Sequence, residues 1–289
     1  MNVEVIRFVT DDGLWLGGLL YTPKEKTDYA IISVHGAQSA CIRIREKIFG
    51  TIATSNGFAY FAFNNRSTAI LERFNKTSKE GKVERVLYGS ANDVLEESIS
   101  DIRSSIKTIL DMGYKKIILL AHCVGCTKVI NYLNNEKKTD FINGICLISP
   151  SDCINYQKNR LKEKYDERLE YAKNNINTKS LVFMDTEDWV LEITTKTYYD
   201  YFNEKSINQL MNYKKDSLLK QWKNLPQNIF ICFCGNNEVV GDNVEKILSK
   251  MKEHFKDKRT KLVLYRESNH SYFGYEEKVM KDIIDFVKE

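Results

Sequence analysis

Cys123 lies where a side chain could most easily act as a nucleophile. It follows the apolar, β-branched run 117–120, and an amphipathic segment begins directly after it. Ala121 and Gly125, two residues before and two after it, are small enough to let both segments approach closely. This pattern predicts a strand, a sharp turn and a helix, with the thiol at the apex. A helix N-terminus favours the thiolate, so Cys123 is the candidate nucleophile.

Several further motifs follow the chain in a recognisable order. They are His35-Gly36 after an apolar run, Asn-Asn-Arg at 64–66, the turn at 121–125, Ser-Pro-Ser-Asp at 149–152, Gly-Asn-Asn-Glu-Val-Val at 235–240 and Asn269-His270. The series resembles the α/β-hydrolases, including uncharacterised bacterial members of the serine-hydrolase type. Their nucleophile elbow normally reads Gly-x-Ser-x-Gly. Here Ala121 replaces the first glycine and Cys123 replaces the serine.

The resemblance implies a nucleophile, then an acid, then a histidine along the chain. His270, in a loop between the last expected strand and the last helix, is the expected base, whereas His254 in a lysine-rich helix reads as a surface residue. Glu238 takes the place of the family's acid. Asp242 is the alternative acid, although its simpler role is to cap the helix that begins there.

The family's oxyanion hole implies two further residues. The backbone N–H of Val124, directly after the nucleophile, is the first expected donor. The second comes from the loop after the third strand, where Ala37 is favoured and Gln38 is the next choice. His35 is expected to shape this loop, and His122 to be structural.

A cysteine nucleophile changes the expected chemistry. Its acyl-enzyme would be a thioester, which favours hydrolysis of esters, thioesters or lactones. An acyltransferase or cyclase using the same intermediate is the alternative, and a ligand-binding pseudohydrolase is the alternative outside enzymes. Dienelactone hydrolases, a cysteine-using branch of the superfamily, show that the fold accepts a thiol. Cys123 could also be a variant of reduced activity or an engineered serine replacement.

The elements that must position these residues alternate between strands and helices. Apolar runs at 29–34, 58–63, 117–120, 144–148, 229–234 and 262–265 predict strands, and residues 3–9 and 14–21 predict a hairpin. Helices are expected at 42–55, 95–109, 244–255 and around 279–286. The fold class is therefore α/β with a mostly parallel sheet covered on both faces. Residues 1–150 and 225–289 form the expected core, and 151–224 form a helical lid insertion.

Composition excludes several classes of function. The chain has 289 residues, 43% hydrophobic, and a net charge of +4 that is spread along the sequence, which argues against nucleic acid as a partner. No segment predicts a membrane span, and seven cysteines without a signal peptide predict a cytoplasmic protein with reduced thiols. Cys146 and Cys232 are expected in the core. The expected partner is a small acyl substrate, free or carrier-bound, and the oligomeric state stays open.

No cofactor or metal is expected. The sequence lacks a dinucleotide or P-loop glycine pattern, and beyond Cys123 and Cys126 it has no second cysteine or histidine pair at ligand spacing. Cys123 and Cys126 form a Cys-x-x-Cys pair, which would indicate redox chemistry in a thioredoxin-like protein. The surrounding pattern of elements differs from that fold, so a redox role is disfavoured.

Overall fold

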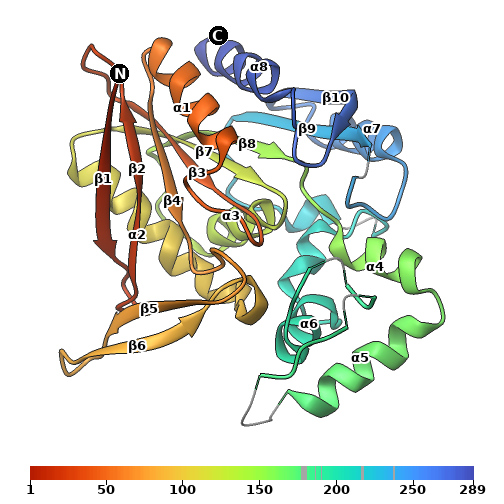
Figure 1. Ribbon diagram of the computed structural model, residues 1–289. Coiled ribbons are helices and arrows are strands. Elements are labelled where there is room, and N and C mark those ends of the chain that lie inside the picture. Colours follow the sequence, from red (N-terminus) through yellow and green to blue (C-terminus); the bar gives the residue numbers. More distant parts are fainter. Residues whose placement is uncertain (177–180, 186, 190, 216–217, 237) are drawn as a thin grey trace.

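The central sheet of this protein contains eight strands among the described residues, with helices on both of its faces (Figure 1). The computed structural model describes residues 1–176, 181–185, 187–189, 191–215, 218–236 and 238–289. The strand order is β1-β2-β4-β3-β7-β8-β9-β10. The pairs β1–β2 and β2–β4 are antiparallel, and the pairs from β4 to β10 are parallel. The strands are β1 (Asn2–Val9), β2 (Trp15–Thr22), β3 (Tyr29–Val34), β4 (Ala59–Asn64), β7 (Lys116–His122), β8 (Ile142–Ile148), β9 (Asn228–Asn236) and β10 (Arg259–Asn269).

Continuous apolar runs form the inner strands because these strands are buried on both faces. In β7, Ile117 and Leu119 belong to the apolar cluster on one face, and Ile118 and Leu120 belong to the cluster on the other. Helices α1 (Ile44–Ser55) and α8 (Glu276–Lys288) cover the second face. Helices α2 (Ser98–Asp111), α3 (Val124–Asn135) and α7 (Val244–His254) cover the first. The expected α/β architecture is confirmed.

A small hairpin was not expected from the sequence. Strands β5 (Glu72–Thr77) and β6 (Val83–Tyr88) pair antiparallel outside the main sheet. Their residues are exposed or partly exposed and often charged, so no apolar alternation marks them. Two 3₁₀ turns, η1 (Ser90–Asn92) and η2 (Leu95–Glu97), then lead into α2.

The segment between β8 and β9 is helical in its described residues. It contains α4 (Cys153–Leu161), α5 (Lys164–Asn175), α6 (Thr195–Phe202) and the 3₁₀ turns η3 (Ile207–Met211) and η4 (Leu218–Gln221). Figure 1 shows α4, α5 and α6 grouped to one side of the sheet. Trp189, Tyr198 and Phe202 form a third apolar cluster with neighbours from these helices and with Leu95 and Val124. Tyr213 and Trp222 instead join the core beside the sheet, so this segment packs in two different ways.

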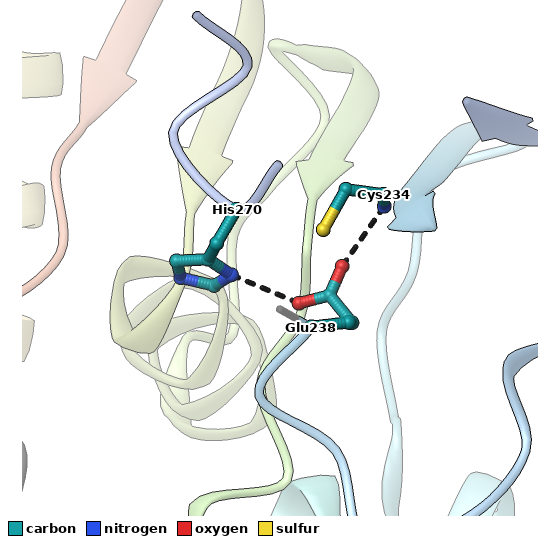
Figure 2. A group of neighbouring side chains, drawn as sticks. All are labelled: Cys234, Glu238 and His270. Carbon is teal, nitrogen blue, oxygen red and sulfur yellow. Dashed lines mark hydrogen bonds and ion pairs between the residues drawn. The ribbon is translucent and has the colours of Figure 1, made fainter. Parts of the chain in front are cut away.

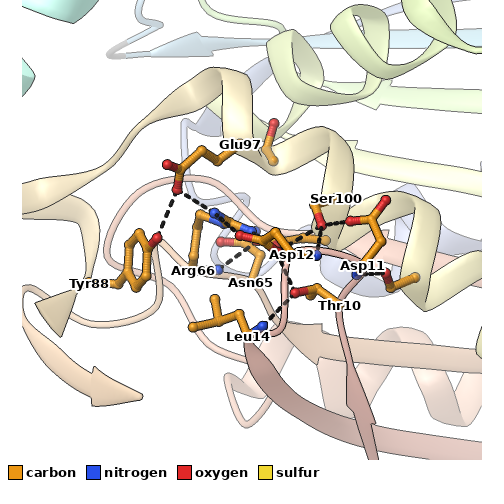
Figure 3. Close-up of polar contacts among 12 residues, drawn as sticks. Thr10, Asp11, Asp12, Leu14, Asn65, Arg66, Tyr88, Glu97 and Ser100 are labelled. Atoms are coloured by element: carbon orange, nitrogen blue, oxygen red, sulfur yellow. Dashed lines mark hydrogen bonds and ion pairs between the residues drawn. The ribbon is translucent and has the colours of Figure 1, made fainter. Parts of the chain in front are cut away.

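A network of buried ion pairs lies at the end of β4, and Figure 3 shows Arg66 of this network with Asp12 and Glu97. The Arg66 guanidinium is fully buried and contacts the equally buried Asp101 carboxylate at 2.6 Å. It also pairs with Asp12, at 3.1 Å, and with Glu97. The Arg66 backbone N–H donates to Asp101 Oδ2 at 2.9 Å. These contacts join the β1–β2 turn, the end of β4 and helix α2.

We expect Arg66→Leu to destabilise the fold by about 3–5 kcal/mol, because it leaves the Asp101 carboxylate buried without its partner. The measurement is the free energy of unfolding in urea. Lys107→Leu is the matched control, since the Lys107–Asp111 pair is exposed and its loss should cost about 0.5 kcal/mol or less. Equal losses in the two variants would contradict a structural role for the network.

Candidate active site

The turn between β7 and α3 holds Cys123 in a backbone conformation that ordinary residues rarely adopt. Its φ is 57° and its ψ is −131°, and its N–H donates to the Ile148 carbonyl at 3.0 Å. A Cβ at Gly125 would lie 2.3 Å from the Val34 carbonyl oxygen, and one at Gly36 would lie 2.8 Å from the Cys123 Cβ. Only glycine lets the end of β3 approach the turn this closely. The expected strand–turn–helix with Cys123 at its apex is therefore present.

The loops after β9 and β10 bring Glu238 and His270 together. Nδ1 of His270 lies 2.9 Å from Oε1 of Glu238, and Figure 2 shows the imidazole facing the carboxylate. Cys123, at the end of β7, and His270 line the same cavity. Three separate strands thus deliver the three expected residues to one edge of the sheet, where the carboxyl ends of parallel strands place ligand sites.

The Glu238 carboxylate is saturated with hydrogen bonds. Oε2 accepts from the Cys234 N–H at 2.9 Å and from the Ser149 hydroxyl at 2.6 Å. Oε1 accepts from the Val239 N–H at 2.9 Å in addition to His270. Burial alone would raise the pKa of Glu238, but the hydrogen bond and charge of His270 outweigh it, so this pKa is lowered. Glu238 is therefore an ionised acceptor that fixes the proton of His270 on Nδ1.

Cys123 and His270 shift each other's ionisation. Burial alone would raise the pKa of the Cys123 thiol, but the positive charge of His270 outweighs it and the pKa is lowered. Burial alone would lower the pKa of His270, but the negative charge of Cys123 raises it well above its usual range. Nε2 of His270 is buried and has no hydrogen-bond partner within the described part of the chain. The arrangement favours a thiolate–imidazolium pair and leaves one ring nitrogen for proton transfer.

Asp242 lies outside this group. Its carboxylate pairs with Lys246 at 3.1 Å and accepts from the Asn243 N–H, and no contact with His270 is found among the described residues. The predicted capping role of Asp242 is wrong: Asn243 caps α7, since its side chain accepts from the Lys246 N–H at 3.0 Å. Both Asp and Asn are suitable N-cap residues, so the residue types alone do not decide which of the two adjacent positions caps α7.

The loop after β3 is held by His35. Its Nδ1–H donates to the Gly36 carbonyl at 2.7 Å, and its Nε2 accepts from the Asn65 N–H at 3.1 Å and from the Thr68 hydroxyl at 2.9 Å. Burial lowers the pKa of His35 to about 3, so this ring is neutral. His35 therefore shapes the loop, as expected, and exchanges no proton with substrate. Ala37 and Gln38 follow it and line the same cavity as Cys123 and Val124.

His122 positions the loop of His270. Its Nε2–H donates to the backbone carbonyl of His270 at 2.8 Å, and the two rings lie 5.0 Å apart. Burial and the charge of Arg45 lower the pKa of His122 well below its usual range. A neutral His122 can hold this bond at any ordinary pH. His254, the other histidine after Cys123, is exposed on α7.

A cavity of about 540 Å³ opens beside the Cys123 side chain. Trp189, Leu191 and Tyr201, all from the segment between β8 and β9, form part of its wall. Exposed apolar side chains of Ile44 and Phe273 stand among its lining residues. The sequence does not show which aromatic residues of this segment face a cavity. In the structure Trp189 and Tyr201 belong to the buried apolar cluster and also line the cavity.

The cysteines form no disulfides among the described residues. All seven are free thiols, and Cys146 and Cys232 are buried, as expected. Cys126 is buried inside α3, and its thiol donates to the Ala121 carbonyl at 3.4 Å.

Cys234, Glu238 and His270 place possible metal-ligand atoms within 4.8 Å of one another. The Glu238 oxygens already accept four hydrogen bonds, so we assign no metal to this group.

No helix in the described ranges is long and apolar enough to cross a membrane.

Residues 78–202 match a family model described as "Serine hydrolase". No curated protein is significantly similar in sequence to this chain.

Solved structures of esterases and related hydrolases share the fold over nearly the whole chain. An esterase from Pyrococcus furiosus is 15% identical, with 99% of this chain and 91% of that chain covered and a TM-score of 0.65. The siderophore hydrolase EstB from Aspergillus fumigatus is 11% identical, with coverage of 99% and 97% and a TM-score of 0.71. Est1E from Butyrivibrio proteoclasticus, with ferulic acid bound, is 14% identical, with coverage of 98% and 99% and a TM-score of 0.63. This chain therefore has the α/β-hydrolase fold.

Proposed function

We propose that this protein is a hydrolase that cleaves an ester, thioester or lactone through an acyl-enzyme on Cys123. Cys123 is the nucleophile, His270 the general base and acid, and Glu238 the orienting carboxylate. The observation that carries the proposal is the state of His270. Its Nδ1 bonds to Glu238, its buried Nε2 has no hydrogen-bond partner among the described residues, and the negative charge of Cys123 raises its pKa.

The chemistry proceeds in two halves. The Cys123 thiolate attacks the substrate carbonyl, and the bond to the leaving group breaks as His270 Nε2 donates its proton to that group. Water then loses a proton to Nε2, attacks the thioester and releases the acid and the thiolate. The backbone N–H groups of Val124 and Ala37 are the proposed donors to the oxyanion. Val124 is the first residue of α3, so its N–H has no acceptor within the helix and can donate to the oxyanion. The helix dipole also favours a negative charge at this end of α3.

The cavity supports an acyl group with an apolar or aromatic body. Trp189, Leu191 and Tyr201 supply apolar wall, and Est1E, a protein of the same fold, binds ferulic acid. We propose residues 151–224 as the segment that covers the site, with α4 and α6 nearest the cavity. A covered thioester would meet less water, so the same site could serve an acyltransferase.

Incubation with p-nitrophenyl and acyl-thioester substrates should add one acyl mass to the intact protein. The mass should be absent in Cys123→Ala, because the thioester has no sulfur to form on, and present in the matched control Cys146→Ala. Intact-protein mass spectrometry measures both. Loss of the added mass in water identifies a hydrolase, whereas loss only with an added amine or thiol identifies a transferase. Acylation that persists in Cys123→Ala, or none in the native protein, would refute the proposal.

Glu238→Gln should lower kcat by roughly 10-fold to 10⁴-fold with a small change in KM, because the amide no longer fixes the Nδ1 proton of His270. We expect a loss near the lower limit, since a thiolate needs less help from a base than an alcohol does. Asp242→Asn is the control and should keep kcat, because Asp242 contacts Lys246 rather than His270. Steady-state kinetics with a p-nitrophenyl ester decides the matter. A kinetic loss at Asp242 but not at Glu238 would reverse the assignment.

Leu191→Ala should change acyl selectivity, because Leu191 is part of the cavity wall. We expect the ratio of kcat/KM for a bulky aromatic ester to that for an acetyl ester to rise by roughly tenfold. Leu181→Ala is the matched control in the same segment, where the side chain is exposed and outside the cavity lining. If both variants keep the native ratio, the segment does not form the acyl site.

A further inference from the structure

The tetrapeptide Ser149–Pro150–Ser151–Asp152 has no part in the mechanism above, yet it touches both ends of the proposed triad. The Ser149 hydroxyl donates to Glu238 Oε2 at 2.6 Å. The Ser151 hydroxyl lies 3.5 Å from the Cys123 sulfur and donates to it. One turn of chain after β8 therefore places a hydroxyl on the acid and another on the nucleophile.

Hydrogen bonds from Tyr213 and from the start of α4 fix the conformation of this turn. Ser149 has a left-handed φ of 48°. The Tyr213 hydroxyl donates to the Pro150 carbonyl at 2.8 Å. The Asp152 carboxylate caps α4 by accepting from the Asn155 N–H at 3.0 Å, and it also accepts from the Tyr213 N–H at 2.9 Å. Ser151 itself is fully buried, so its hydroxyl is limited to partners inside the protein.

The Ser151 hydroxyl has two acceptors and one proton. Besides the sulfur, it can donate to the Ser149 carbonyl oxygen at 3.0 Å. A hydrogen bond to a charged acceptor is stronger than one to a neutral acceptor. The proton therefore favours the sulfur when Cys123 is a thiolate and the carbonyl when the sulfur is a thiol or a thioester.

We propose that Ser151 is a further catalytic residue, which donates its hydrogen bond to the Cys123 sulfur whenever that sulfur is anionic and returns it to the Ser149 carbonyl while the sulfur is acylated. This inference rests on the proposed role of Cys123. Ser151 transfers no proton. In deacylation the carbon–sulfur bond breaks, its electron pair goes to the sulfur, and the proton of the attacking water goes to His270. Ser151 stabilises the departing thiolate.

The other ionisable groups around the sulfur come from several elements. They are His270 after β10 with Glu238 behind it, Cys126 on α3, Cys153 on α4 and Tyr201 on α6. Burial raises the pKa of Cys126, Cys153 and Tyr201 well above their usual ranges, so these three are neutral near pH 7. Arg43 and Arg45 near α1 and Glu276 on α8 also line the cavity of Cys123. His270 is the charged group that lowers the pKa of Cys123, and Ser151 is the neutral donor to its sulfur.

The test is the pH profile of Cys123 alkylation by iodoacetamide, followed by peptide mass spectrometry, which needs no acyl substrate. At pH 6 we expect Ser151→Ala to react about tenfold more slowly than the native protein, because less thiolate forms without the hydrogen bond. At a pH where Cys123 is fully ionised, the variant should react at least as fast, since a less stabilised thiolate is more nucleophilic. Ser151→Thr should restore the native profile.

Ser105→Ala is the matched control, because Ser105 is equally buried and its hydroxyl, among the residues that the structure describes, donates to the Ile102 carbonyl alone. Its profile should match that of the native protein. A native profile in Ser151→Ala, or the same displaced profile in Ser151→Ala and Ser151→Thr, would overturn the role of Ser151. If native Cys123 reacts no faster than Cys146, the proposed function itself fails, and the two failures are thus distinguishable.

Discussion

The site depends on a charge pair that neither partner could sustain alone. A buried thiol resists ionisation, and a buried imidazole resists protonation, because each charged form loses its hydration. Cys123 and His270 line the same cavity, where the charge of each favours the charged form of the other, and Glu238 accepts a hydrogen bond from His270 Nδ1. The carboxylate in turn relies on four donors, among them the backbone N–H groups of Cys234 and Val239. Removal of any member leaves a buried charge without compensation.

The fold supplies the geometry that this pair requires. Close approach of β3 to the elbow, permitted by Gly36 and Gly125, fixes Cys123 in its left-handed backbone conformation. The ends of β9 and β10 carry Glu238 and His270, and His122 ties the His270 loop back to β7. Rigid neighbours matter because proton transfer and attack tolerate little misplacement. The buried Arg66 network at the end of β4 is part of the same rigid frame.

The sequence was informative where local pattern decides structure. Apolar runs predicted the inner strands to within a few residues, and the spacing around Cys123 predicted the elbow. The β5–β6 hairpin was missed because its exposed, charged residues show no alternation. Asp242 was wrongly predicted to cap α7, because the neighbouring Asn243, which does cap it, suits an N-cap equally well. The contacts of Ser149 and Ser151 join residues 89 and 28 positions away, respectively, so only the folded chain brings them together.

The central claim is that Cys123 and His270 form a coupled ion pair. The most direct measurement is the protonation of His270 by NMR of the imidazole as a function of pH, in the native protein and in Cys123→Ala. The account predicts that native His270 stays protonated above the usual histidine range, because the negative sulfur raises its pKa. In Cys123→Ala the titration of His270 should move to lower pH than in the native protein, because burial still disfavours the charged ring and the negative sulfur is gone. Identical titration of His270 in the two proteins would contradict the account.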